Sequence, residues 1–389
     1  MNIMFIFYQP IISSKGGVPR VTHRLTEELL RRGHNVIFVS YTDKEDIEKN
    51  NIIAPQYHIE LKGRSGEEIK QELNYLAQKH NITHAICQTL GISYLFQYLP
   101  ESIKKIAVCH AQPFSFMGIS RKRIWNTNAQ NLRQLLFKTA SLISPKVFEN
   151  YFYKLEKQTL ETAYKYADKI CYISDKFYPR LMKYVPNFPH DKLVAINNPN
   201  TYDIASIELP KDKENIVLWV GRVENSQKNA TDFVRMWQVL SKRAKDWRAI
   251  MVGDGNDLAY IKDYVKKNNI ERIEFTGRRS DTETFYKKAK YVAITSFWES
   301  WCLVLTEAMS YGCVPVVYDT YETLHDIVDN NVNGYILPAI SYQSMADCLY
   351  DSMQQKEKFE EFSIAAKEKM YKFTLESTVD KWETFLNSL

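Results

Sequence analysis

Hydrophobic and polar positions along the chain follow two alternating patterns: short apolar runs, and longer segments with helical spacing. In the first half, apolar runs predict buried strands at residues 3–8, 36–40, 85–88 and 106–109. Apolar residues at helical spacing predict helices over residues 20–32 and 67–80. Strands that alternate with helices are typical of an α/β protein with a mostly parallel sheet.

The same pattern restarts after Asn197-Asn198-Pro199-Asn200, a stretch that breaks regular structure. Five further strands are predicted at residues 216–220, 249–252, 272–275, 291–295 and 314–317, with helices between them. We therefore place a boundary near residues 200–214 and expect two doubly wound domains that face a cleft. Ligands of such sheets bind at the carboxyl ends of the strands, so this cleft is the expected site.

The composition agrees with a globular protein of two domains and excludes several other classes. The 389 residues exceed the size at which one core usually stops growing, and 45% of them are hydrophobic and 25% charged. The net charge of +5 is too small to indicate a nucleic-acid partner, although it permits an anionic ligand or a membrane surface. The six cysteines are scattered without metal-ligand spacing, which indicates reduced thiols in the core.

No run of about 18 apolar residues occurs and the start of the chain does not resemble a signal peptide, so we expect a cytoplasmic protein. Between residues 113 and 150 the alternation lapses, and Glu149 is the one acid. The basic and aromatic residues of this segment include Arg121, Lys122, Arg123, Trp125, Arg133, Phe137, Lys138 and Lys146. We interpret it as an insertion or helical arm that either covers the first domain or meets an anionic lipid face or a polymeric acceptor.

The strongest candidate site is a pair of carboxylates, Glu299 and Glu307, which follow a predicted strand at the start of a helix. With Ser300 as the helix cap, they lie roughly 12 Å apart along the axis. This is too far for the roughly 5 Å dyad of a retaining glycosidase and suits the two ends of one extended ligand. Between them, the amides of Ser300, Trp301 and Cys302 would favour a phosphate at a helix N-terminus. A ligand with hydroxyls at both ends and a phosphate between them has the polarity of a nucleotide sugar. The alternative interpretation is that Glu299 and Glu307 are two surface glutamates on an ordinary helix.

Two cations and a glycine pair lie at other predicted strand ends. Arg222 follows a strand directly, and Lys228 comes six residues later. A forked donor and a point charge together would stabilise a departing nucleoside diphosphate, although each alone is also typical of a surface cation. Gly16 and Gly17 stand between the first strand and the first helix, where backbone amides can approach a ligand or form an ordinary tight turn.

Two further motifs bear on the class of enzyme. Gly253-Asp254-Gly255 follows a predicted strand but lacks the third glycine of a dinucleotide fingerprint, which argues against a nicotinamide enzyme. His110 ends a predicted strand and is expected to face the cleft. Its imidazole would hydrogen-bond a sugar hydroxyl or carry a partial positive charge near the reacting centre; the alternative is a structural histidine.

Taken in order, these motifs resemble the GT-B glycosyltransferases of glycosyltransferase family 4 over nearly the whole chain. The order of the pieces is more specific than any one of them. The segments that carry the resemblance are Gly16-Gly17, Gly33-His34-Asn35-Val36, His110, Ile196-Asn197-Asn198-Pro199, Gly221-Arg222, Lys228-Asn229, Gly253-Asp254-Gly255, Phe275-Thr276-Gly277, Ser296 to Glu307 with its Glu-x7-Glu spacing, Gly312-Cys313-Val314-Pro315-Val316-Val317 and Asn333-Gly334.

The resemblance implies two Rossmann-like domains facing a central cleft, residues 1–200 on the acceptor side and residues 201–372 on the donor side. Residues 373–389 are similar to the family's last helix, which crosses back to the first domain. The resemblance also implies transfer with retention at the anomeric carbon, a nucleotide-sugar donor, and no metal or other cofactor.

Roles for single residues follow from the same resemblance. Glu299 would contact the donor sugar, Glu307 the ribose hydroxyls, and Arg222 with Lys228 the diphosphate. His110 would lie near the donor sugar. The remaining donor contacts fall on Gly16, Gly17, Ser300, Trp301, Cys302 and Leu303. The family commonly has Gly-Phe-Gly where this chain has Ser300-Trp301-Cys302, so side chains are added where the backbone meets the ligand.

We therefore expect a retaining, metal-independent hexosyltransferase that moves a sugar from a UDP- or GDP-linked donor to a glycan or lipid-linked acceptor in cell-surface polysaccharide or lipopolysaccharide synthesis. Peripheral contact with an anionic membrane is part of this expectation, and nucleic acid is not. One alternative is a non-catalytic nucleotide-sugar-binding subunit. Another is a nucleotide-sugar epimerase of the same architecture, which needs an acid/base pair that the sequence does not reveal.

Overall fold

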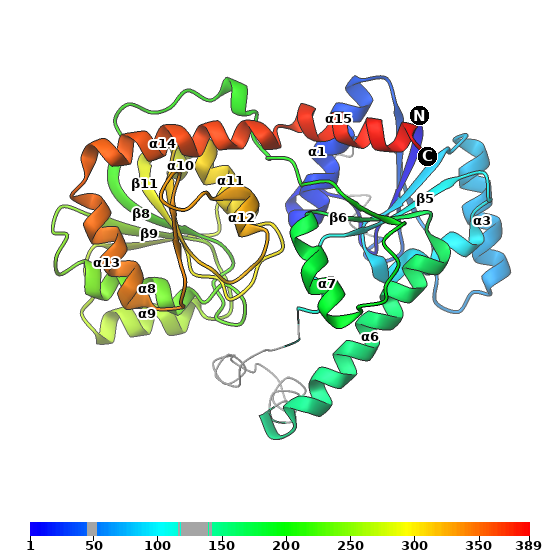
Figure 1. Cartoon of the computed structure of the whole chain (residues 1–389). Coiled ribbons are helices and arrows are strands. Elements are labelled where there is room, and N and C mark those ends of the chain that lie inside the picture. Colours follow the sequence, from blue (N-terminus) through cyan, green and yellow to red (C-terminus); the bar gives the residue numbers. More distant parts are fainter. Residues whose placement is uncertain (45–52, 116, 118–138, 140–141) are drawn as a thin grey trace. The chain divides into compact units, whose positions relative to one another are not determined.

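The chain divides into two compact units in a computed structural model that describes residues 1–44, 53–115, 117, 139 and 142–389 (Figure 1). Unit 1 comprises Met1–Phe114, Phe152–Thr201 and Phe373–Leu389. Unit 2 comprises Tyr202–Lys372 and the described residues of Ser115–Tyr151. Of the basic and aromatic segment, residues 118–138 lie outside the described residues, so the structure does not bear on its interpretation there.

Unit 1 is built on a parallel sheet in which seven strands are described, in the order β3-β2-β1-β4-β5-β6-β7. The strands are β1 (Asn2–Ile6), β2 (Asn35–Ser40), β3 (Gln56–His58), β4 (His84–Cys87), β5 (Lys104–Cys109), β6 (Lys169–Tyr172) and β7 (Leu193–Ala195). The helices are α1 (Gly17–Arg31), α3 (Gly66–Lys79), α6 (Pro145–Tyr166), α7 (Tyr178–Tyr184) and α15 (Leu375–Asn387). The order runs outward from β1 in both directions, which is a doubly wound topology.

Unit 2 repeats this plan with six described strands in the order β10-β9-β8-β11-β12-β13, all of them parallel. The strands are β8 (Glu214–Val220), β9 (Arg248–Val252), β10 (Ile273–Gly277), β11 (Ala289–Ile294), β12 (Val314–Tyr318) and β13 (Tyr335–Leu337). The helices are α8 (Ala230–Leu240), α9 (Leu258–Lys267), α10 (Glu283–Lys288), α11 (Leu303–Ser310), α12 (Leu324–Ile327), α13 (Tyr342–Met353) and α14 (Lys356–Met370). The expected α/β fold with two doubly wound domains is therefore confirmed.

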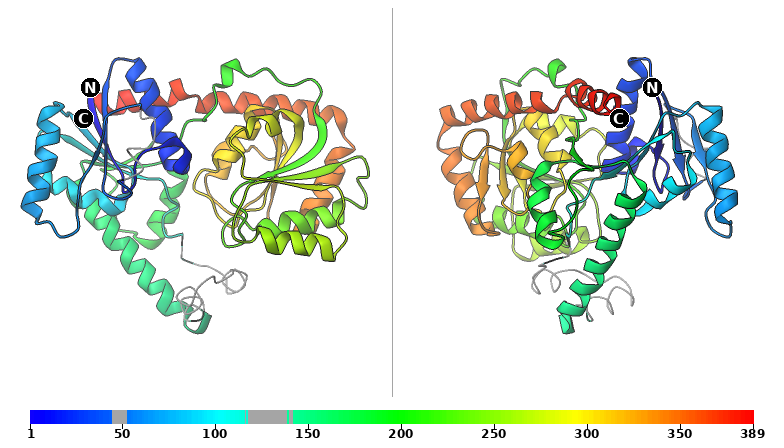
Figure 2. Two further views of the ribbon diagram at one scale, coloured as in Figure 1. Left: turned by 180° about the vertical axis from the view of Figure 1, so that it is seen from behind. Right: turned by 45° about the vertical axis from the view of Figure 1, so that its right-hand side comes forward.

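Both sheets are buried because helices cover both of their faces, as the two views of Figure 2 show for each unit. Strands in such sheets are apolar almost throughout. In β1, the four residues from Ile3 to Ile6 are all buried, and Phe5 lies opposite Phe38 of β2 and Ile86 of β4. The continuous apolar runs of the sequence thus correspond to the central strands.

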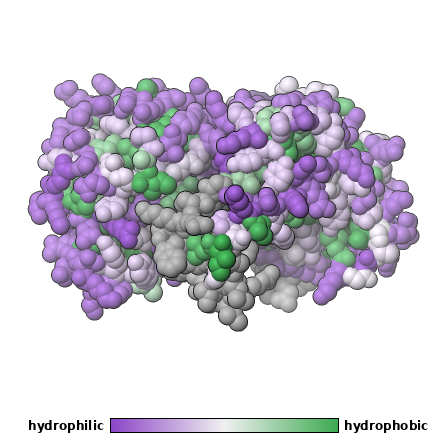
Figure 3. Space-filling model, turned by 60° about the horizontal axis from the view of Figure 1, so that its bottom comes forward, coloured by the Kyte–Doolittle hydropathy of each residue, from purple (hydrophilic) through white to green (hydrophobic). Residues whose placement is uncertain are grey.

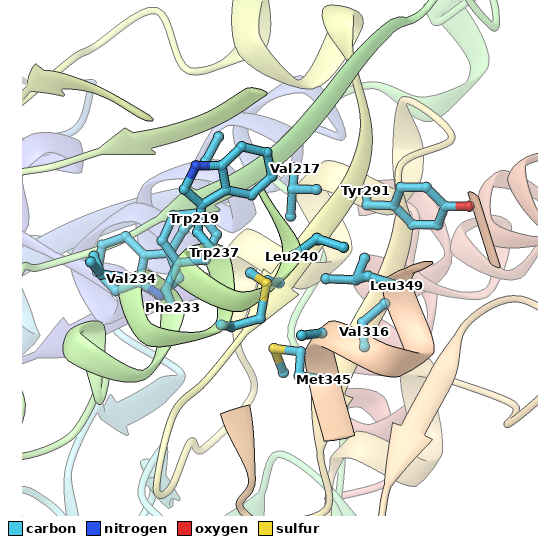
Figure 4. Packing of buried hydrophobic residues seen from close by; sticks show 14 of the residues in the cluster. Val217, Trp219, Phe233, Val234, Trp237, Leu240, Tyr291, Val316, Met345 and Leu349 are labelled. Atoms are coloured by element: carbon cyan, nitrogen blue, oxygen red, sulfur yellow. The ribbon is translucent and has the colours of Figure 1, made fainter. Parts of the chain in front are cut away.

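The core of unit 2 lies between its sheet and helices α8 and α13 (Figure 4). Helix α8 contributes Phe233, Trp237 and Leu240, which recur at helical spacing on its buried face. They pack with Trp219 of β8 and Leu349 of α13. Trp219, Trp237 and Phe233 together bury a large apolar area. Their packing stabilises the sheet that carries the candidate site.

The terminal helix α15 belongs to unit 1, where it packs against α1. Thr374 caps it by accepting a hydrogen bond from the amide of Ser377. Arg32, just after α1, contacts Asp380 and Glu383 of α15 at 2.6 Å each. The imidazole of His34 lies 2.6 Å from Glu383, and this hydrogen bond is the main reason that the pKa of Glu383 is lowered. Ion pairs as well as packing therefore hold the last helix to the first.

The outer surface is polar over most of the face drawn in Figure 3, with hydrophobic residues scattered among hydrophilic ones. No helix in the described part of the chain is both long and apolar enough to cross a bilayer. All six cysteines are free thiols, and all but Cys348 are buried, as expected from the sequence.

We predict that Arg32→Met lowers the free energy of unfolding by about 1–3 kcal/mol, because carboxylates on α15 lose their cation. Arg31→Met is the matched control, since Arg31 also bonds Glu28 but is 69% exposed, and the attraction of Glu376 on α15 is the weakest of its electrostatic contacts. We expect a much smaller loss from the control. Urea unfolding of both variants measures this, and equal losses would contradict the role assigned to the contacts with α15.

Candidate functional site

The candidate donor site lies at the carboxyl ends of β8 and β11 in unit 2. The strand order turns around between these neighbours, because β9 and β10 lie beyond β8, and β12 and β13 lie beyond β11. Such a switch point opens a crevice at the carboxyl ends of the strands, where open α/β sheets bind ligands. Arg222 and Lys228 follow β8, and Glu299 follows β11, so these three predicted residues belong to adjacent loops.

Hydrogen bonds between interior groups join these two loops. The indole of Trp219 donates to the hydroxyl of Thr295 at 3.0 Å, and that hydroxyl donates to the carbonyl of Lys228 at 2.8 Å. The amide of Phe297 donates to the carbonyl of Gln227 at 2.8 Å. The loops are therefore fixed to one another before any ligand is present.

A partly buried ion pair lies between the loops: Glu299 is buried and the side chain of Lys228 is 21% exposed. The ammonium of Lys228 contacts Oε1 of Glu299 at 2.6 Å, and the hydroxyl of Ser296 donates to the same oxygen at 2.7 Å. Burial disfavours the charge of Lys228, but the attraction of Glu299 outweighs it and the pKa of Lys228 is raised. The structure thus brings together a predicted cation and a predicted carboxylate that stand 71 residues apart.

Arg222 is more exposed than Lys228. Its guanidinium contacts Glu224 at 2.8 Å and is 62% exposed. The turn that carries it is supported by the Gly253-Asp254-Gly255 loop after β9: a Cβ on Gly253 would lie 1.8 Å from the carbonyl oxygen of Gly221, and the amide of Val223 donates to Asp254. These glycines are therefore explained by close packing of two loops, which agrees with the argument against a nicotinamide fingerprint.

Helix α11 begins at Leu303, so the expectation that Ser300 caps this helix is wrong. The residue before the helix is Cys302, which has a left-handed φ of 58° and makes no side-chain cap. A residue in the left-handed region cannot continue a right-handed helix, so the helix does not extend back through Cys302. Ser300 and Trp301 therefore lie in the loop, and their amides do not belong to the first helical turn. Glu307 lies on the buried side of α11, where its carboxylate accepts a hydrogen bond from Tyr286 at 3.0 Å.

Hydrogen bonds from the segment after β12 fix the loop that contains Ser300-Trp301-Cys302. After β12, the hydroxyls of Thr320 and Thr323 donate to the carbonyls of Ser296 and Ser300, at 2.8 and 2.7 Å. Trp301 and Cys302 are buried, and burial raises the pKa of the Cys302 thiol to about 12. Cys302 is therefore an uncharged thiol that fills space, not a nucleophile.

In unit 1, the predicted residues lie at the carboxyl ends of the strands. Gly16, with a φ of 129°, precedes α1, which begins at Gly17 in the connection after β1. His110 follows β5, and its Nε2 lies 2.5 Å from Oε1 of Gln88, which follows β4. Because the amide oxygen of Gln88 can only accept, Nε2 carries the proton and Nδ1 is an acceptor. Nδ1 is buried and has no hydrogen-bond partner among the described residues.

The protonation of His110 decides between its two predicted roles. Burial lowers its pKa to about 4, so the ring is neutral at physiological pH. A neutral ring does not supply the partial positive charge, whereas its Nδ1 lone pair suits the hydroxyl of a sugar.

Sequence reasoning missed Ser296, Gln88 and Tyr286, each of which bonds a predicted residue. Ser296 stands three residues before Glu299 and was detectable as a nearby hydroxyl. Gln88 and Tyr286 lie 22 and 21 residues from their partners, and only the fold brings them together. In the part of the chain that the structure describes, no group of three or more His, Cys, Asp or Glu side chains forms a candidate metal site.

Comparisons with known proteins agree with this arrangement. Residues 202–369, within unit 2, match the model of the family Glycosyl transferases group 1. An uncharacterized glycosyltransferase of Haemophilus influenzae is 22% identical over 98% of this chain and 99% of its own. An alpha-1,4-N-acetyl-D-galactosaminyltransferase of Campylobacter jejuni, whose name includes a glycan on PP-undecaprenol, is 25% identical over 63% of this chain and 67% of its own.

The fold is also that of a solved structure. The crystal structure of Anabaena HepE in complex with UDP has a TM-score of 0.74 to this chain at 16% identity and covers 100% of both chains. The structural likeness shows the GT-B fold along the whole chain, and the family model matches residues 202–369 of unit 2.

We predict that Lys228→Met lowers the free energy of unfolding by about 2–4 kcal/mol, because Glu299 is left buried without its cation. The double variant Lys228→Met/Glu299→Gln removes the charge as well and keeps an acceptor for Ser296, so it regains most of the loss. Urea unfolding followed by tryptophan fluorescence compares the two. Equal losses in the single and double variants would show that the ion pair is not what holds the loops.

Proposed function

We propose that this protein is a glycosyltransferase that moves a sugar from a UDP- or GDP-linked donor to a hydroxyl of a glycan or lipid-linked acceptor in cell-surface polysaccharide synthesis. The observation that carries the proposal is the partly buried ion pair of Lys228 and Glu299 at the switch point of the unit 2 sheet. The names of the relatives and the UDP-bound fold neighbour support it.

The proposed chemistry is transfer with retention and without a metal ion. The bond from the anomeric carbon to the leaving phosphate breaks, and a bond to the acceptor oxygen forms on the same face. The acceptor's proton passes to an oxygen of the departing diphosphate, so no protein base is required. In this proposal Arg222 and Lys228 stabilise the charge that develops on the leaving group, and Glu299 orients the donor sugar.

Two further side chains, one in each unit, have roles in this proposal. Glu307, fixed on α11, accepts hydrogen bonds from the ribose hydroxyls. Neutral His110 accepts a hydrogen bond at Nδ1 from a hydroxyl of the donor sugar, with Gln88 fixing the tautomer.

The alternatives make different demands on these residues. An epimerase needs an acid and a base beside the sugar ring, and His110 with a pKa of about 4 is a poor proton donor at neutral pH. A non-catalytic subunit would bind the nucleotide sugar and release no nucleoside diphosphate.

We predict that UDP or GDP, and a sugar ester of the same base, raise the melting temperature, since a ligand at 100 times its Kd adds about 2.7 kcal/mol. Glu307→Ala weakens this effect through the lost ribose contact. Arg222→Ala slows release of nucleoside diphosphate from the nucleotide sugar by roughly 10- to 100-fold and changes binding less, because its charge acts mainly in the transition state.

The matched control is Arg248→Ala, because Arg248 begins β9 at the amino ends of the strands, away from their carboxyl ends, and pairs there with Glu214. We expect this variant to keep normal binding and turnover. No shift with any nucleotide would contradict the proposed donor. A shift without release of nucleoside diphosphate would favour the non-catalytic subunit.

We also propose that α6 brings the protein to an anionic membrane surface near a lipid-linked acceptor. Four apolar side chains recur at every fourth residue around its start and are exposed: Ile143 (76%), Val147 (66%), Tyr151 (62%) and Leu155 (47%). Residues at this spacing share one face of a helix, and Lys146 and Lys154 are exposed on the same segment. An exposed apolar stripe with adjacent lysines suits the interface of an anionic bilayer.

We predict that the protein cosediments with vesicles of phosphatidylglycerol more than with those of phosphatidylcholine. Val147→Ser/Tyr151→Ser reduces the bound fraction several-fold, because the stripe loses two apolar side chains. Tyr75→Ser on α3 is the control, as Tyr75 is 60% exposed outside the stripe. Equal recovery with both lipids, or an equal effect of the control, would argue against this role of α6.

A further inference from the structure

Tyr286 is a buried tyrosine of unit 2 for which the proposed reaction has not yet given a role. It lies on α10, and its hydroxyl donates to Oε2 of Glu307 on α11 at 3.0 Å. Both side chains are almost fully shielded from solvent. Burial, and then the negative charge of Glu307, raise the pKa of Tyr286 well above its ordinary value, so the phenol keeps its proton and remains a donor.

The ring of Tyr286 is held by two other tyrosines. It stacks on Tyr311, with centroids 6.1 Å apart and planes at 23°, and meets the edge of Tyr202 at 6.3 Å. Tyr202 and Tyr311 also contact each other, with centroids 5.3 Å apart. A phenol in such a cluster has little freedom to move its hydroxyl away from Glu307.

The backbone of Tyr286 is anchored as well. The buried ammonium of Lys213 donates to the carbonyls of Tyr286 and Ala289 at 2.8 Å each. The thiol of Cys313 donates to the same two carbonyls at 3.2 Å. These carbonyls lie at the C-terminal end of a short helix, where a cation satisfies groups that lack intrahelical partners. These contacts explain why the charged side chain of Lys213 is tolerated inside this unit.

We propose that Tyr286 is a positioning residue that fixes the carboxylate of Glu307 for recognition of the ribose diol. The terminal torsion of a glutamate is broad, so an isolated carboxylate samples many orientations. A hydrogen bond from a fixed phenol selects one of them. A carboxylate has about four lone-pair sites, so it can accept a hydrogen bond from Tyr286 and also accept one from a ribose hydroxyl.

This inference rests on the proposed function, because it assigns Tyr286 to the ribose subsite of that donor site. Its consequence is selectivity for ribose over deoxyribose. A site built to accept a hydroxyl rejects the analogue that lacks it, because the acceptor is then left unpaired. Loosening the carboxylate should reduce this discrimination more than it reduces overall affinity.

The test measures binding of UDP and dUDP, and of GDP and dGDP, by isothermal titration calorimetry. For whichever base binds, we expect unaltered protein to prefer the ribonucleotide by about 10-fold or more. Tyr286→Phe removes only the hydroxyl and should weaken ribonucleotide binding by about 3- to 10-fold, with a smaller effect on the deoxyribonucleotide. In Glu307→Ala the preference should nearly disappear.

The matched control is Tyr291→Phe, because Tyr291 is equally buried in unit 2 and its hydroxyl bonds Ser352 at 2.7 Å. This variant should keep the preference, and circular dichroism of both variants checks that each is folded. A preference lost in Glu307→Ala but unchanged in folded Tyr286→Phe would overturn the inference and leave the proposed function intact. No binding of UDP or GDP to unaltered protein would overturn the proposed function and this assignment together.

Discussion

The ion pair of Lys228 and Glu299 is the contact on which the candidate donor site depends. A carboxylate inside a protein is costly unless it is paired and hydrogen-bonded. Glu299 has both kinds of partner, since Lys228 supplies the charge and Ser296 a hydrogen bond to the same oxygen. The pair joins the loop after β8 to the loop after β11, so the neighbouring strands that define the switch point also share an electrostatic contact.

In the proposed reaction this constraint matters because charged groups act best when they are oriented before the reaction begins. The hydrogen bonds through Thr295 and the backbone of Gln227 fix the loops independently of the charges. Little conformational entropy then remains to be lost when a donor binds. Arg222, which is exposed and held only at the loop surface, differs from Lys228 in this respect. The loop after β8 thus carries one rigid cation, Lys228, and one more mobile cation, Arg222.

The sequence predicted the central strands and several site residues, and it failed where long-range contacts or unusual backbone decide. Apolar runs identified most of the strands from β8 to β12, but the edge strands β3 (Gln-Tyr-His) and β13 (Tyr-Ile-Leu) are half-buried and only three residues long, too short for a clear signal. Ser300 was expected to cap the helix after Glu299, but the helix begins at Leu303 because Cys302 adopts a left-handed conformation that propensity does not favour. Gln88 and Tyr286 were missed because their partners are distant in sequence.

The departure from Gly-Phe-Gly can now be interpreted in physical terms. Cys302 has the φ of 58° that glycine adopts at little cost, so the backbone keeps a glycine-like path although a side chain is present. That side chain and the indole of Trp301 are 7% and 2% exposed, which places the added bulk among interior groups. Burial, and then the proximity of Cys302, raise the pKa of Tyr321 well above its ordinary value, so this neighbouring phenol is also uncharged. The loop accommodates the substitutions by packing both side chains inward. The hydrogen bond from Thr323, in the segment after β12, to the carbonyl of Ser300 offsets the backbone strain at Cys302.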